Sequence, residues 1–264
     1  MQDSDRDGKG RGTQVGVIRG RENRKINLSP FFNHYKGEIM SIHSKILVHW
    51  TGKDIANTKK SQLYVERLKD DLKNGLFTKR TSEDSIRGTS VKNLLRICFS
   101  EIRLSQAQKH AKRYGELGIG FTREFMMNKG CRPVIYIPFD EIPDGNILED
   151  SIRNLYTNLK DRKEIFRSVK WIMAHVKRMS NEKDEDYYEE MEWRIVHDES
   201  PDNKHFTKGK GDGVHRLKFT AYDIKVIIFP DEDTKQLSLK DEVIRKYFSK
   251  HIPTMVTLED CNSF

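Results

Sequence analysis

The stretch KILVHW at residues 45–50 is the clearest indicator of the fold. Its run of aliphatic and aromatic residues is typical of a strand, and Thr51 and Gly52 directly after it are a stop signal. Comparable runs occur as LLRICF at 94–99, PVIYIP at 133–138 and IKVIIFP at 224–230, with a shorter one near 255–257. Residues 190–197 alternate between apolar and polar side chains. Each of these segments therefore predicts a strand.

Apolar residues at helical spacing separate these strands. The spacing predicts helices over 63–76, closed by Asn74 and Gly75, over 105–114 with Ser105 as its cap, over 147–179 as one long or two consecutive helices, and through Val243 and Phe248. The resulting order of elements does not alternate strictly between strand and helix, as a doubly wound sheet would. We therefore predict an α+β fold, with helices packed on a mixed, mostly antiparallel sheet.

The composition divides the chain into a leader and one domain. Residues 1–39 have almost no hydrophobic period, so we expect a disordered leader that cannot offset the entropy of ordering. The Lys36-Gly37-Glu38 codons can spell a purine-rich ribosome-binding sequence, which suggests that translation begins at Met40. Residues 40–264 are expected to form a single α+β domain.

Several classes of protein are disfavoured by the sequence. No stretch approaches the ~20 apolar residues of a membrane span, and no signal peptide opens the chain, so we expect a cytoplasmic protein without a membrane partner. Three distant cysteines and the absence of paired histidine spacings give no support for a metal site. The net charge of +8 is spread over 48 basic and 40 acidic residues. Nucleic acid therefore stays a candidate partner rather than a required one, with the basic residues of 204–210 as its contact.

A set of short motifs points to a known family. They are HWTG at 49–52, CFSEIRLS at 98–105, GIGF at 118–121 and EMEWR at 190–194. Together they resemble the AbiGi family of bacterial abortive-infection proteins, over roughly residues 45–230. The resemblance implies phage defence by an abortive-infection pair in which this type of chain is the antitoxin, with a toxin or another defence protein as its partner.

A more distant similarity concerns ADP-ribosyltransferases of the DarT type. These enzymes carry a strand that ends in His, a later strand of the form Tyr/Cys-Phe-Ala/Ser leading to a Ser-rich helix, and a late strand with Glu or Glu-x-Glu. His49, the CFS run at 98–100 and the EME run at 190–192 occupy these places in the same order. The similarity implies an ADP-ribosyltransferase-like fold and NAD as a substrate.

The same similarity assigns roles to individual residues. It implies that Glu192, His49 and Tyr114 are catalytic, and that the ligand is bound by Thr51, Phe99, Ser100, Ser105 and Glu190. Cleavage of the nicotinamide–ribose bond creates an oxocarbenium-like cation, which a carboxylate can stabilise. A His donor would position the ribose, and an aromatic face would stack on the nicotinamide.

Each assignment has a structural alternative. Glu192 would equally form an ion pair with Arg194 on its own strand, or with Arg96 or Lys225 nearby. His49 would be a hydrogen-bonded core histidine, and Tyr114 a core aromatic that closes a helix. A non-catalytic binding module that restrains a partner toxin or binds nucleic acid is therefore the alternative to an enzyme.

Overall fold

The computed structural model describes residues 44–55, 60–81, 94–101, 103–137, 147–159, 161–179, 188–197, 204–209 and 214–263. All of these residues belong to one compact unit, Ser41–Phe264. The predicted leader, residues 1–39, and the proposed start at Met40 lie outside the described residues.

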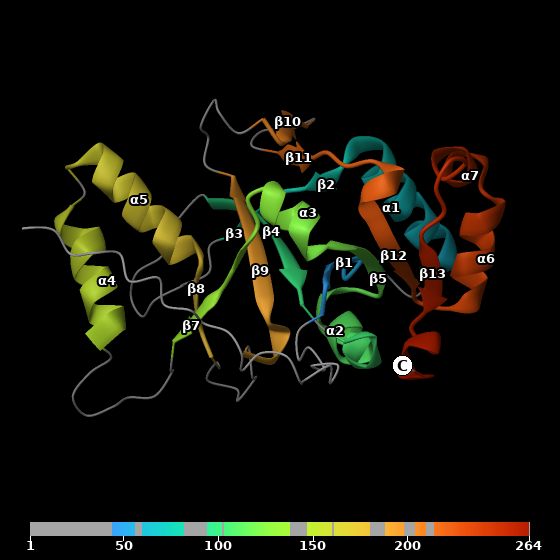
Figure 1. Ribbon diagram of the computed structural model, residues 1–264, viewed down its shortest axis with the longest axis horizontal. Helices are drawn as coiled ribbons and strands as arrows, with labels where there is room; N and C mark the ends of the chain where they lie inside the picture. The colour runs from blue at the N-terminus through green and yellow to red at the C-terminus, as the bar shows by residue number, and fades with distance from the viewer. Residues whose placement is uncertain are drawn as a thin grey trace, which may run out of the picture. The chain divides into compact units, whose positions relative to one another are not determined.

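A mixed, mostly antiparallel sheet forms the centre of the fold (Figure 1), which confirms the predicted α+β class. Neighbouring strands are antiparallel except β12 and β13, which run parallel. The order across the sheet is β13 (Thr254–Thr257), β12 (Ile224–Phe229), β5 (Leu117–Thr122), β1 (Ile46–Thr51), β4 (Leu94–Ser100), β9 (Glu192–His197) and β6 (Arg132–Pro133), and β3 (Lys79–Thr81) also pairs with β4.

Two smaller sheets and seven helices complete the described structure. One small sheet contains β10 (Phe206–Lys208), β11 (His215–Leu217) and β2 (Leu76–Phe77), and the other pairs β7 (Ile135–Ile137) with β8 (Val176–Arg178). The helices are α1 (Lys60–Asn74), α2 (Ala107–Tyr114), α3 (Arg123–Asn128), α4 (Ile147–Asn158), α5 (Lys163–Ala174), α6 (Glu232–Lys240) and α7 (Glu242–Tyr247). Within the part of the chain that is described, none of the helices is long and apolar enough to cross a membrane.

Separate apolar clusters cover the two faces of the sheet. Leu47, Phe99 and Ile195 pack on one face with residues of α1. Val48 and Trp50 pack on the other face with residues of α2. Since side chains alternate along a strand, His49 and Phe99 share the α1 face, whereas Ser100 and its cross-strand neighbour Glu192 share the α2 face with Val48.

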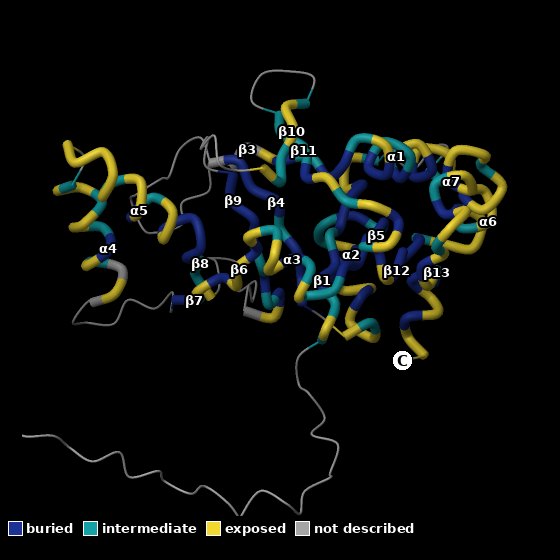
Figure 2. The backbone as a smooth tube through the Cα atoms, turned by 45° about the horizontal axis from the view of Figure 1, so that its top comes forward, coloured by how far each residue is buried: buried dark blue, intermediate teal, exposed yellow. Residues whose placement is uncertain are grey.

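We call the elements α4, α5, β7 and β8 together the helical arm. They contain a third apolar cluster, whose buried residues all come from the arm except Val196 of β9. In Figure 1 the arm lies beyond the β9 side of the sheet, and Figure 2 shows that its two helices are far more exposed than the strands.

The sheet forks at β4. The β1–β4 ladder holds a single described pair, Val48 with Ser100, after which the two strands diverge. At the opposite end of β4, β3 pairs with residues 94–96. The edge of β4 at residues 97–99 therefore faces a gap between β1 and β3, and the site described below is built around that gap.

Local chemistry explains where the predicted elements differ from the observed ones. Ser105 does not cap a helix, because it lies in the 3-10 turn Leu104–Gln106 and α2 begins two residues later without a side-chain cap. The predicted strand 133–138 is divided between β6 and β7. The C-terminal helix is two helices, since Asp241 is extended and its carboxylate accepts the amides of Val243 and Ile244. Helix α3 and strand β8 were not predicted.

Candidate functional site

A cavity of about 340 Å³ opens at the fork of the sheet. Seven of the eight residues proposed from the sequence line it: His49, Thr51, Phe99, Ser100, Tyr114, Glu190 and Glu192. Ser105 is exposed and lies outside the lining. His49 and Glu192 lie on opposite faces of the sheet, yet both reach this cavity because the gap beside β4 opens between the two faces.

The side chain of His49 on β1 hydrogen-bonds to the backbone of β4, at a point where the two strands have no described backbone pair. Its Nδ1 lies 2.9 Å from the carbonyl oxygen of Cys98, which only accepts hydrogen bonds, so Nδ1 carries the proton. Burial lowers the pKa of His49, so the ring is neutral and Nε2 is an acceptor. Its ring contacts that of Phe99, with centroids 5.6 Å apart. His49 therefore offers a ligand an acceptor, whereas the sequence-based hypothesis gave it a donor role.

Glu190 and Glu192, which we call the carboxylate pair, are both buried. Lys177 donates to Glu190 Oε2 at 2.6 Å and to Glu192 Oε2 at 3.0 Å. Glu190 Oε1 accepts from Arg113 at 3.0 Å and from the hydroxyl of Tyr114. Burial raises the pKa of Tyr114, and the adjacent Glu190 charge adds to that effect. Tyr114 is thus a donor to the pair rather than a simple core aromatic.

Glu192 makes the ion pair that the structural alternative predicted. Arg194 donates its Nε to Glu192 Oε1 at 2.7 Å and its Nη2 to Oε2 at 3.0 Å, in a buried bidentate arrangement. Burial opposes ionisation of Glu192, but Arg194 and Lys177 outweigh it and hold its pKa far below the usual range. Lys225 is not a partner, since it lies on β12 and donates to the carbonyl of Tyr222.

Backbone conformation places the carboxylate pair at the start of β9. Met191, between the two glutamates, has φ 41°, in the left-handed region that non-glycine residues rarely adopt. Glu190 closes a short 3-10 turn and Glu192 opens the strand. Such strain persists only where the surrounding structure imposes it, and it concentrates at functional sites.

Basic side chains also line the cavity. Arg67 of α1 donates to Thr51 Oγ1 at 3.0 Å and to Asp54 Oδ2 at 2.7 Å. The lining contains five cationic side chains and three carboxylates, so its formal net charge is +2, which favours an anionic ligand. The cations are Lys53, Arg67, Lys79, Arg96 and Lys177.

Sequence reasoning named Arg96 only as a possible partner of Glu192 and missed the other four cations. Arg67 lies on α1, where the apolar spacing predicted the buried face of the helix but gave no information on its polar residues. Lys177 lies on β8, in a segment that was predicted to be helical. Only the spatial arrangement identifies the basic residues of the cavity.

Comparison with known proteins assigns the family. Residues 71–230 match the family model described as "Putative abortive phage resistance protein AbiGi, antitoxin". A search of curated proteins and a search of solved structures each found no match. The matched segment covers more than half of the chain and carries β4, β9 and the carboxylate pair. The chain belongs to the AbiGi family.

Proposed function

We propose that this protein acts in abortive phage defence through its cavity, which binds NAD and supports ADP-ribosyl transfer. One observation carries the proposal. Residues of β1, β4 and β9 that the similarity to ADP-ribosyltransferases singled out in the sequence line a single cavity. The family assignment supports the role in defence.

The chemistry of the lining suits such a ligand. Arg67 and Lys79 would face the pyrophosphate, because cations bind phosphate oxygens through charge-assisted hydrogen bonds. The neutral Nε2 of His49 would accept a hydroxyl or amide proton, and Phe99 would offer an aromatic edge. Glu190 and Glu192 line the same cavity, and Arg194 and Lys177 hold the pKa of Glu192 far below its usual range, so Glu192 brings a negative charge to it.

In the proposed reaction the bond between the nicotinamide nitrogen and ribose C1′ breaks. Nicotinamide leaves with the bonding electrons, and the carboxylate pair stabilises the cation that develops at C1′. An acceptor nucleophile then attacks C1′ and releases its proton. Because Glu192 already accepts three hydrogen bonds from Arg194 and Lys177, its contribution in this arrangement is electrostatic.

Ligand binding by the wild-type chain tests the proposal directly. By calorimetry we expect NAD and ADP-ribose to bind, and Lys79→Gln to weaken ADP-ribose binding about tenfold, the effect of losing one charged hydrogen bond. Lys218→Gln is the matched control, because Lys218 is exposed and outside the cavity lining. Absence of binding at millimolar NAD and ADP-ribose would contradict the proposal, as would equal effects of the two variants.

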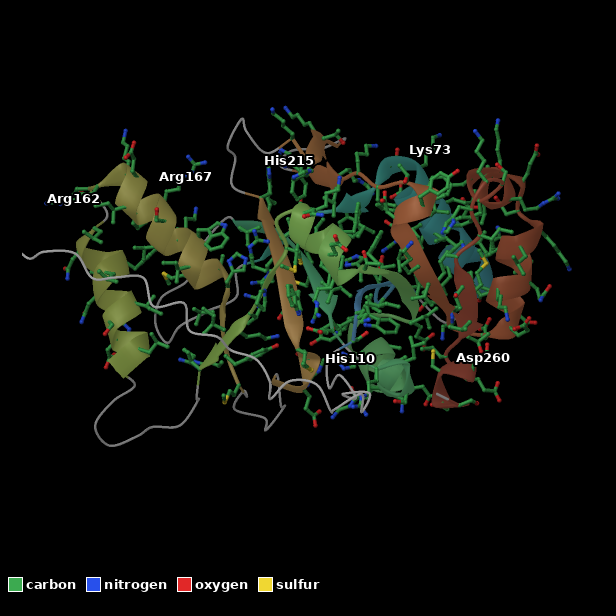
Figure 3. The ribbon with its side chains drawn as sticks, in the orientation of Figure 1. Lys73, His110, Arg162, Arg167, His215 and Asp260 are labelled. Carbon is green, nitrogen blue, oxygen red and sulfur yellow. The ribbon has the colours of Figure 1, made fainter. Side chains whose placement is uncertain are left out.

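The helical arm favours a second candidate, a non-catalytic module that restrains a partner toxin. Leu148 and Leu155 on α4, and Ile165 and Ile172 on α5, repeat at seven-residue spacing, and each is at least 44% exposed. Such stripes on a helix are typical of protein interfaces. Arg162, the residue directly before α5, is exposed at this surface (Figure 3), and its positive charge would suit an acidic partner.

Salt dependence separates a nucleic acid partner from a protein partner. Lys204 and Lys208 are exposed at β10, whereas Lys210 lies outside the described residues. If this basic segment binds nucleic acid, log affinity falls against log salt with a slope of about −0.9 for each phosphate neutralised. Lys208→Gln should then reduce the slope by about 1, and Lys240→Gln on α6 should leave it unchanged. A flat dependence, or no binding at low salt, would exclude this form of the second candidate.

A further inference from the structure

The helical arm is joined to the sheet through the carboxylate pair and its partners. Lys177 of β8 donates to Glu190 and Glu192, at 2.6 and 3.0 Å. The amide of Glu192 donates to the hydroxyl oxygen of Tyr136 on β7 at 2.8 Å. Arg194 donates its Nη1 to the carbonyl of Ala174, the last residue of α5, at 2.7 Å. The same charges that line the cavity therefore hold the arm in place.

Arg194 connects the two structures most directly. Arg194 is 1% exposed, and its Nε and Nη2 donate to the two carboxylate oxygens of Glu192. The terminal carbonyls of a helix lack partners within the helix, and a cation there also complements the helix dipole. The orientation of Glu192 thus determines how well the end of α5 is capped.

Lys177 connects the arm to the interior of the cavity. It is a lining residue, and its charge persists because the two carboxylates outweigh burial and raise its pKa. Lys177 thus supplies a positive charge to the cavity from the arm and compensates the two carboxylates there. Without the arm in place, an anionic ligand would meet these carboxylates uncompensated, so the ligand binds more tightly when the arm is in place and binding must stabilise the arm.

We propose that Lys177 is a positioning residue that couples the cavity to the helical arm, so that an oxyanion ligand bound in the cavity stabilises the arm against the sheet. The ligand class, which includes the pyrophosphate of NAD, rests on the proposed function. The coupling itself does not, because it follows from contacts present without a ligand.

The coupling is tested first on the ligand-free full chain by hydrogen exchange with mass spectrometry. We expect Lys177→Gln to accelerate exchange at residues 163–179 about tenfold or more, because it leaves the carboxylate pair without one of its buried cations. Lys163→Gln, an exposed change on the same helix, should alter exchange less than twofold. Lys177→Arg, which keeps the charge, should retain most of the protection, so that a general folding defect is recognised.

The same measurement with ADP-ribose, and separately with inorganic pyrophosphate, tests the ligand effect. Either probe is expected to slow exchange in the arm of the wild type about tenfold, and this slowing should be lost in Lys177→Gln. Unchanged arm exchange in ligand-free Lys177→Gln overturns the coupling. Binding of ADP-ribose without any slowing overturns the ligand effect while the proposed function stands. Failure of both probes to bind overturns the ligand effect, and the missing ADP-ribose binding contradicts the proposed function.

Discussion

Glu192→Gln is expected to lower the free energy of unfolding by about 3 kcal/mol, because it leaves the buried Arg194 and Lys177 cations without full compensation. Chemical denaturation at neutral pH measures this loss. The same variant is expected to reduce NAD turnover at least 100-fold, since it removes the charge placed to stabilise the developing cation. Glu189→Gln is the control, because Glu189 is exposed and pairs with Lys109 at the surface.

A double variant separates stability from chemistry. Replacing a whole buried ion pair by neutral side chains is often nearly neutral for stability. Glu192→Gln combined with Arg194→Met should therefore recover at least half of the lost stability, while NAD turnover stays low. If turnover returns together with stability, Glu192 has only a structural role and the catalytic assignment is wrong.

Asp71→Asn is expected to stabilise the protein strongly at alkaline pH. Asp71 lies on α1, is fully buried, and neither of its carboxylate oxygens has a hydrogen-bond partner among the described residues. Burial raises the pKa of Asp71 from 3.8 to about 7, although Arg67 acts in the opposite direction. At pH 8 to 9 the substitution removes a buried charge, which corresponds to at most about 4 kcal/mol of stability.

The effect of Asp71→Asn on stability depends on pH, because the pKa of Asp71 is raised in the folded state. The folded state holds a proton on Asp71 at pH values where the unfolded state has lost it, so stability declines as pH rises from about 4 to about 7. The gain from Asp71→Asn should therefore disappear below pH 4. Asp70→Asn is the control, because hydrogen bonds from Asn74 and Arg216 outweigh burial and lower the pKa of Asp70, so this change should reduce stability at neutral pH. A pH-independent effect of Asp71→Asn would contradict the argument.

The central strands were predictable because the residues that specify each strand lie within the strand itself or directly beside it. The runs at 45–50 and 94–99 combine apolar continuity with clear stop signals, and they became β1 and β4 nearly unchanged. The alternation at 190–197 placed Glu192 and Arg194 on one face of β9, and the observed bidentate pair follows from that spacing. The class of the fold and the family motifs were likewise readable from the chain itself.

The short elements were less predictable because tertiary contacts select them. Strand β8 is a three-residue segment that continues the apolar period of α5, so a helical pattern describes it equally well until β7 pairs with it. Helix α3 is six residues long and depends on Thr122, whose hydroxyl accepts the amide of Phe125. Neither segment carries enough local pattern to be recognised alone.

The sequence by itself determined the long central strands, which of their side chains share a face, and the order of His49, Phe99 and Glu192 along the chain. Local alternation places His49 and Glu192 on opposite faces of the sheet, which would separate them in a continuous sheet. Only the tertiary structure brings them to one cavity, because β1 leaves β4 after a single pair and β3 takes the other end of that strand. The divergence of the strands depends on long-range pairing, which the local sequence pattern does not specify. The same holds for the positions of Arg67 and Lys177, which line the cavity from elements distant in the sequence.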